Sequence, residues 1–117
     1  MIENFGIGID IVNVKKFKKI PYDSKPGFYK KIFLPSEISY CLRYRNSYEH
    51  FAGKFAIKEA VIKSIDEKLS PLKIKTSHSN SKPKVEILDK TFRKFVFMAS
   101  ISHDENYAVG VVISQKS

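Results

Sequence analysis

The segment YEHFAGKFAIKEAVIKSID, residues 48–66, decides how this chain folds. It contains no proline and is rich in helix-forming residues, and Asn46 with Glu49 has the spacing of a capping box. The pattern predicts one long helix. Its large apolar residues, which occupy most of the helix circumference, are Phe51, Phe55, Ile57, Val61, Ile62 and Ile65. We expect such a helix to be buried, so the charged residues that it carries are informative.

Two of these charged residues, Glu59 and Lys63, lie one helical turn apart. Because four positions separate them, they are roughly 40° apart around the helix axis. The small residues Ala52 and Ala56 fall on the same side, which predicts an open, charged groove. Taken alone, a Glu four residues before a Lys is more often a surface ion pair.

A short strand is predicted before this helix, at residues 5–12, where apolar residues alternate with glycines and one carboxylate. Gly6 and Gly8 lie on the same face as Asp10 and would let either a ligand or a helix backbone approach closely. An isolated Asp in a strand is usually solvated. Together, however, Asp10 and Glu59 can supply two oxygen ligands to Mg²⁺, which keeps several waters and binds phosphate oxygens.

The rest of the chain reads as alternating helices and hairpins. Residues 14–20 form a short basic helix or turn around Phe17, and residues 37–44 follow Pro35 as a second short helix. Two hairpins are expected, from residues 72–77 with 82–88 and from residues 95–102 with 107–114, the second being central. The pattern predicts a single α+β domain over residues 1–117.

Composition limits the function without choosing it. Lys and Arg outnumber Asp and Glu by 21 to 12, a formal charge of +9, so the surface attracts anions such as nucleic acid, phosphate cofactors or an acidic protein. The single Cys41 excludes an intrachain disulfide and favours a buried thiol and a cytoplasmic location. The longest uncharged apolar runs are too short to span a bilayer, so no membrane association is expected.

Common cofactor motifs do not fit. GIGID (residues 6–10) lacks the third glycine of a dinucleotide fingerprint, and no Walker lysine follows it. The three histidines, His50, His78 and His103, are scattered and have no cysteine partners at zinc spacing.

Four blocks of the sequence nevertheless occur together in one known family. They are GIGIDIV (6–12), FAGKFAIKEAVIKSI (51–65), KPKVEIL (82–88) and SISHDENYAVGVVI (100–113). In content and order they resemble the signature blocks of holo-acyl-carrier-protein synthases, the small bacterial 4'-phosphopantetheinyl transferases. The resemblance implies an α+β fold with one antiparallel sheet packed on a long buried helix, assembled as a homotrimer with active sites between subunits.

The resemblance also implies a reaction: transfer of 4'-phosphopantetheine from coenzyme A to a serine of apo-acyl carrier protein, with Mg²⁺ as cofactor and release of adenosine 3',5'-bisphosphate. By it, Asp10 and Glu59 match the metal ligands, and Glu59 and Lys63 act in catalysis. Either Glu59 or a water on the metal would accept the serine proton. The residues implied at the coenzyme A site are Lys54, Lys82, Pro83 and His103. Carrier docking would use the basic segment, namely Lys15, Lys16, Phe17, Lys18 and Lys19.

The chain departs from the family pattern in three places, one of which is the segment between Ile65 and Leu72, shorter here than the family's glycine-rich loop. Ser81 replaces the usual glycine before Lys82 and Pro83, and Pro21 and Pro26 interrupt a basic helix that is longer in the family.

Two alternative functions are compatible with the same sequence. The charge and interleaved aromatics would suit a nucleic-acid-binding module, although Asp10 and Glu59 would repel a phosphate backbone, so no nucleic acid partner is expected. The second alternative is an inactive relative of this family that keeps the fold for an interaction role.

Overall fold

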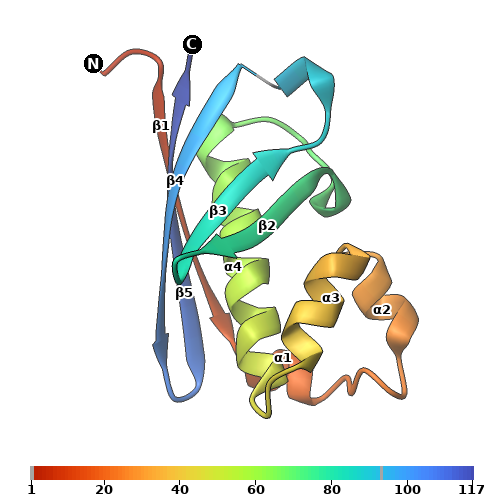
Figure 1. The fold of residues 1–117 in the computed structure, drawn as a ribbon. Coiled ribbons are helices and arrows are strands. Elements are labelled where there is room, and N and C mark those ends of the chain that lie inside the picture. The colour runs from red at the N-terminus through yellow and green to blue at the C-terminus, as the bar shows by residue number, and fades with distance from the viewer. Residues whose placement is uncertain (1, 93) are drawn as a thin grey trace.

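The structure is a computed structural model that describes residues 2–92 and 94–117. Three strands form an antiparallel sheet in the order β1-β5-β4, where β1 is Phe5–Asn13, β4 is Phe95–Asp104 and β5 is Tyr107–Lys116. As predicted, the second hairpin contains the central strand, β5. The long helix α4, Ser47–Ile65, packs across one face of this sheet (Figure 1).

The first hairpin forms a separate sheet, so the expectation of one sheet is wrong. Its strands are β2, Ile74–Ser79, and β3, Lys82–Ile87, joined by Asn80 and Ser81, which both have positive φ. Within the described residues, β3 and β4 share no ladder of main-chain hydrogen bonds. A groove of about 750 Å³ lined by both strands lies between them. Side chains such as Val85 and Phe97 connect the two sheets by packing on a common core cluster.

Glycines allow β1 to lie directly on α4. A Cβ atom at Gly6 would collide with the carbonyl oxygen of Ser64, and one at Gly8 with that of Ala60. The sequence predicted that either a ligand or a helix backbone approaches these glycines. In the structure it is the backbone of α4. The opposite face of β1 points outward, and Ile7, which is 70% exposed, lies on it.

Three short helices connect β1 to α4 on one side of the molecule (Figure 1). They are α1, Lys15–Lys18; α2, Pro26–Lys30; and α3, Pro35–Leu42. The described residues also include two 3₁₀ turns, η1 at Pro71–Lys73 and η2 at Lys90–Phe92. The capping-box prediction at α4 is wrong, because the Asn46 side chain bonds to the Glu49 side chain instead of the helix backbone.

The core divides along α4 into two clusters. Aromatic residues dominate the first, between α1, α2, α3 and the beginning of α4; its fully buried rings are Phe17, Tyr29, Phe33 and Phe51. Aliphatic residues dominate the second, between the end of α4, the β2-β3 hairpin and the sheet; they include Ile57, Val61, Ile74 and Val112. Cys41 is buried as expected, and burial raises the pKa of its thiol to about 12.

Candidate active site

Asp10 and Glu59 face one small cavity. Asp10 lies on the face of β1 that packs on α4, and Glu59 lies on α4 itself. Both line a cavity of about 240 Å³, which is also bordered by Phe55 and Lys16. The two carboxylates that sequence analysis selected from distant segments are thus brought together.

Lys63 meets the strand rather than an open groove. Its Nζ donates to the Ile9 carbonyl oxygen at 3.0 Å and lies 3.2 Å from Asp10 Oδ1. The predicted groove beside Glu59 and Lys63 is wrong in one respect, because Ala52 and Ala56 are fully buried. Their small side chains serve close packing instead.

The donor set at this cavity fits a hard divalent cation. Carboxylate oxygens are preferred by Mg²⁺, which usually takes only one or two protein carboxylates and keeps several waters. Among residues 2–92 and 94–117, no group of three or more His, Cys, Asp or Glu side chains is placed to hold a metal. Because Mg²⁺ is octahedral, a cation bound through the two carboxylates Asp10 and Glu59 would have positions left for water and phosphate oxygens.

A second, larger cavity collects the residues predicted to bind coenzyme A. Its volume is about 560 Å³, and Lys54, Lys82, Pro83 and His103 all line it. These residues come from α4, β3 and β4. The geometry therefore brings together all four positions that the family resemblance selected.

Lys54 is buried although it lines this cavity. It is 2% exposed, and its Nζ donates to Thr76 Oγ1 at 3.1 Å and to the Thr76 carbonyl oxygen at 3.3 Å. The ammonium group also lies 4.7 Å from the centre of the Tyr40 ring. Burial lowers the pKa of Lys54, while the nearby Glu37 carboxylate opposes this shift.

His103 approaches α4 at Gly53. Its Nε2 lies 3.2 Å from the Glu49 carbonyl oxygen. A Cβ atom on Gly53 would lie only 3.2 Å from the same nitrogen. The glycine in the FAGKF segment therefore gives the imidazole room at the cavity.

Three further aromatic residues line this cavity and were not predicted from the sequence, namely Tyr40, His50 and His78. The His78 ring stacks on Tyr40 with a centroid distance of 4.8 Å and an interplanar angle of 8°. Burial is the main cause that lowers the pKa of both His50 and His78. These residues belong to α3, α4 and β2, so no local spacing could have connected them.

The basic segment keeps its lysines exposed but buries its aromatic residue. Lys15, Lys16, Lys18 and Lys19 are all exposed. Phe17 is 0% exposed and packs against rings that include Phe33 and Phe51. The prediction that Phe17 contacts a carrier protein is therefore wrong, because hydrophobic burial has made it the centre of the aromatic core.

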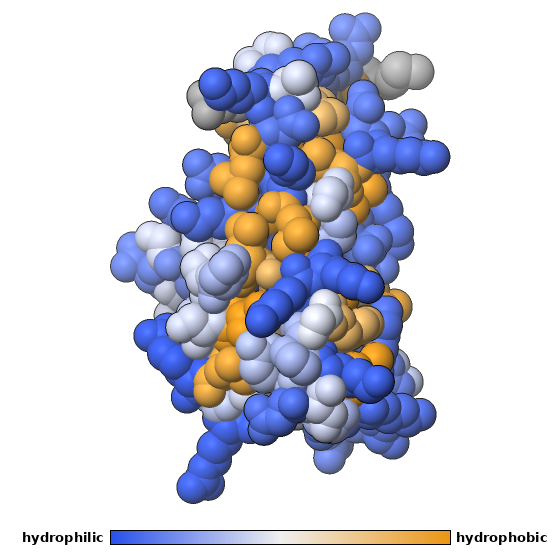
Figure 2. Space-filling view, turned by 90° about the vertical axis from the view of Figure 1, so that its right-hand side faces the viewer, coloured by the Kyte–Doolittle hydropathy of each residue, from blue (hydrophilic) through white to orange (hydrophobic). Residues whose placement is uncertain are grey.

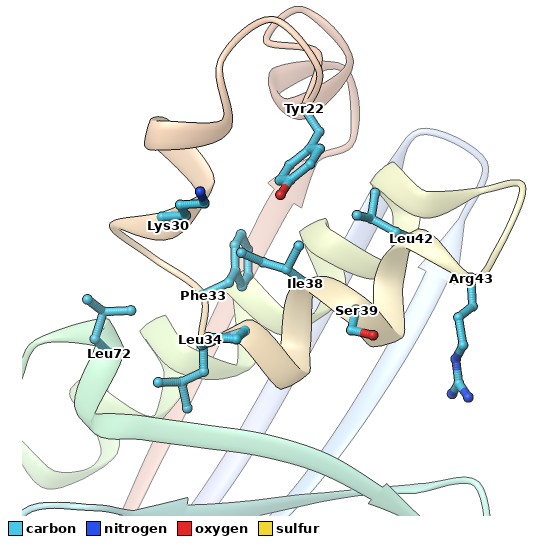
Figure 3. Close-up of a pocket in the computed structure, with 10 residues that line it drawn as sticks. Tyr22, Lys30, Phe33, Leu34, Ile38, Ser39, Leu42, Arg43 and Leu72 are labelled. Atoms are coloured by element: carbon cyan, nitrogen blue, oxygen red, sulfur yellow. The ribbon is translucent and has the colours of Figure 1, made fainter.

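A further hollow lies apart from both cavities, on the face that carries α2 and α3. Figure 2 shows a hydrophobic band on this face between hydrophilic side chains. The hollow, of about 720 Å³, is lined by apolar residues such as Phe33, Ile38 and Leu42, with Lys30 and Arg43 also contributing (Figure 3). It contains none of the predicted site residues.

Comparison with known proteins identifies the family. The model of the 4'-phosphopantetheinyl transferase superfamily matches residues 6–112, so the chain belongs to this superfamily and the family predicted from the four sequence blocks is confirmed. A holo-[acyl-carrier-protein] synthase from Thermodesulfovibrio yellowstonii is 42% identical over 117 residues, which cover 97% of this chain and 98% of the relative.

Solved structures agree with this assignment. The Helicobacter pylori holo-[acyl-carrier-protein] synthase in complex with coenzyme A is similar with a TM-score of 0.82 and 32% identity, covering 93% of this chain and 99% of the other. A Bacillus anthracis synthase in complex with CoA (3',5'-ADP) has a TM-score of 0.81 and 27% identity, covering 96% of each chain. In the part of the chain that the structure describes, no helix has the length and apolarity to cross a membrane.

Proposed function

We propose that this chain transfers the 4'-phosphopantetheine group of coenzyme A to a serine of apo-acyl carrier protein and releases adenosine 3',5'-bisphosphate. The observation that carries the proposal is the convergence of Lys54, Lys82, Pro83 and His103 on one cavity in a chain of this superfamily. The coenzyme A complexes of two similar proteins support it.

Asp10 and Glu59 would hold a Mg²⁺ ion at the smaller cavity. When bound, such an ion neutralises charge on the pyrophosphate of coenzyme A and holds it in line for attack. The serine oxygen forms a bond to the pantetheine-side phosphorus, while the bond from that phosphorus to the bridging oxygen breaks. The electron pair leaves with adenosine 3',5'-bisphosphate. Either Glu59 or a water at the metal site would accept the serine proton.

Lys63 would assist the leaving group. Its side chain is 55% exposed and close to Asp10, so it can reach a phosphate bound at the neighbouring carboxylates. Negative charge on the leaving phosphate increases in the transition state, and a lysine there lowers the barrier more than it strengthens ground-state binding. Lys54, Lys82 and His103 would hold the phosphates and adenosine of the cofactor.

We also propose that the chain assembles as a homotrimer with active sites between subunits. The two cavities share no lining residue within the described chain, and in a trimer residues of a neighbouring copy would complete a site that spans both. The outward face of the sheet supports association because it exposes Ile7, Ile9 and Met98, at 70%, 60% and 72%. Light scattering should give a trimer mass for the wild type and a smaller mass for Ile9→Lys.

The partner on the carrier side would be an acidic surface. Lys15, Lys16, Lys18 and Lys19 form an exposed basic rim beside the cavity that holds Asp10 and Glu59, since Lys16 itself lines that cavity. Complementary charge would steer the carrier protein toward this rim. The reaction would take place in the cytoplasm, where the lone, buried Cys41 stays reduced.

Incubation of the chain with coenzyme A, Mg²⁺ and a panel of apo-acyl carrier proteins tests the proposal. Intact-mass analysis should detect one added phosphopantetheine group on at least one carrier, together with an equal amount of adenosine 3',5'-bisphosphate. A carrier whose modified serine is replaced by alanine is the control. No mass increase on any apo-carrier would contradict the proposal.

A further inference from the structure

A chain of hydrogen bonds leads from Lys54, which lines the cavity of about 560 Å³, to a carboxylate on α3. Thr76 Oγ1, which accepts from Lys54 Nζ at 3.1 Å, donates to Glu37 Oε2 at 2.5 Å. The backbone N–H of Thr76 donates to the same carboxylate oxygen at 2.8 Å. Residues of α4, β2 and α3 are thereby linked behind the cavity.

The direction of these bonds is fixed by chemistry. A hydroxyl has one proton to donate, and an ionised carboxylate can only accept. The Thr76 proton is therefore committed to Glu37, which leaves the lone pairs of Thr76 Oγ1 for Lys54. The Glu37 carboxylate thus makes the threonine hydroxyl an acceptor at the position where the lysine ammonium lies.

Glu37 is itself held in place. It is 1% exposed and accepts from Lys58 Nζ at 2.7 Å and from the Leu34 backbone N–H at 2.7 Å. Charge-assisted hydrogen bonds in a site shielded from water are strong and restrict motion. The carboxylate therefore provides a fixed point for Thr76.

Lys54 is confined on a second side by Tyr40. The ammonium group lies 4.7 Å from the centre of that ring, and Tyr40 is in turn stacked against His78. Within residues 2–92 and 94–117, Thr76 receives both hydrogen bonds that Lys54 Nζ donates. An ammonium group has three N–H donors, and because Lys54 lines the cavity we take the third as the donor to a ligand there.

We propose that Glu37 and Thr76 are positioning residues that orient Lys54 toward a phosphate group in this cavity. The inference rests on the proposed function, because the phosphate is taken to belong to coenzyme A. Thr76 is 4% exposed and Glu37 1%, so both act through Lys54. Fixing a long lysine side chain before binding removes an entropic cost of association. The effect belongs to cofactor affinity and leaves the rate of transfer unchanged.

Replacement of Thr76 by valine tests this directly, since valine keeps the shape and the backbone contacts but lacks the hydroxyl. We expect Thr76→Val to weaken coenzyme A binding about tenfold in calorimetry and in KM, with kcat within about twofold of the wild type. Thr76→Ser restores the hydroxyl and should restore affinity. In a Lys54→Met background, Thr76→Val should have no further effect on KM. Glu37→Gln alone is a poorer test, because it disturbs Lys58 and can prevent folding.

Ser114→Ala is a matched control. Ser114 Oγ is also buried and donates to the Ser64 carbonyl oxygen at 3.0 Å, but it does not line the cavity. Its loss should lower the thermal midpoint without changing KM for coenzyme A. An unchanged KM in Thr76→Val, or an equal rise in Ser114→Ala, would overturn the inference. A wild type that binds coenzyme A but modifies no carrier would instead overturn the proposed function, and calorimetry would still test the positioning of Lys54.

Discussion

Two lysines of α4, Lys58 and Lys63, each pair with a carboxylate, and the pairs differ in their exposure to water. Lys58 Nζ lies 2.7 Å from Glu37 Oε1, and the two side chains are 1% and 0% exposed. Lys63 Nζ lies 3.2 Å from Asp10 Oδ1, and these side chains are 55% and 18% exposed. One helix therefore carries a closed ion pair and an open one.

This difference in exposure indicates that the pair Lys58–Glu37 supports the fold, whereas Lys63 and Asp10 can still bind a ligand. Burying two charges is costly unless other hydrogen bonds satisfy them. Lys58 meets this condition, because it also donates to the carbonyl oxygens of Ile32 and Pro71 and so ties α4 to the segment between α2 and α3 and to η1. A solvent-exposed pair contributes about 1 kcal/mol or less, so Lys63 and Asp10 can exchange their contact for a ligand at little cost to stability.

Breaking the closed pair should have the largest effect. Glu37→Ala leaves the Lys58 ammonium buried without its countercharge, and we expect a loss of about 3–5 kcal/mol in the free energy of unfolding. Urea denaturation followed by circular dichroism measures it. The double variant Glu37→Leu/Lys58→Met should regain part of the loss, since it removes both charges. A loss below about 1 kcal/mol in Glu37→Ala would show that the pair does not support the fold.

Removing either carboxylate of the cavity that holds Asp10 and Glu59 should abolish activity instead of stability. Asp10→Ala and Glu59→Ala each delete a proposed metal ligand outside the apolar core, so transfer should fall by more than about a hundredfold. The thermal midpoint should stay close to that of the wild type. Turnover and thermal unfolding are measured on the same samples. Wild-type-like turnover in either variant would remove the metal hypothesis.

Lys63→Ala tests the lysine of the exposed pair. We expect kcat to fall about tenfold or more while KM for coenzyme A changes little, because the proposed contact strengthens as the leaving phosphate gains charge. Unfolding should change by less than about 1 kcal/mol. Steady-state kinetics in coenzyme A separate these quantities. A defect in KM alone would reassign Lys63 to ground-state binding.

The smallest effect is expected at the basic rim. Lys15→Glu with Lys19→Glu should raise KM for the carrier protein about threefold to tenfold, leave KM for coenzyme A unchanged and weaken the inhibition by added salt. Lys90→Glu with Lys94→Glu, two exposed lysines outside the basic rim, gives a charge-matched control. Kinetics with each substrate varied separately make the distinction. An unchanged carrier KM at low salt would mean that the carrier approaches from another surface.

Local sequence patterns were sufficient to predict the strand that carries Asp10 and the helix that carries Glu59. The alternation of residues 5–12 and the uninterrupted segment 48–66 correspond to β1 and α4. Asp10 and Glu59 stood out because their neighbours are glycines and apolar residues. Their meeting at one cavity follows from the glycine face of β1 packing on α4.

Long-range contacts explain what local patterns could not give. A helical wheel treats Lys54 and Lys58 as surface charges, but Glu37 and Thr76, from α3 and β2, make their burial possible. Phe17 looked like a surface contact among four lysines, whereas the aromatic residues of α2 and α4 surround it. The separation of the β2-β3 hairpin from the main sheet depends on side-chain packing, which strand patterns do not encode.

The dependence of transfer on Mg²⁺ tests the central claim most directly, namely that Asp10 and Glu59 form the reaction centre. Intact-mass analysis would follow the modification of apo-carrier by the wild type and by Glu59→Gln while free Mg²⁺ is varied in a chelating buffer. We expect wild-type transfer to rise with Mg²⁺ from a negligible rate in excess chelator to saturation, and Glu59→Gln to stay inactive at every concentration. Wild-type transfer that continues unchanged in excess chelator, or full activity of Glu59→Gln, would contradict the claim.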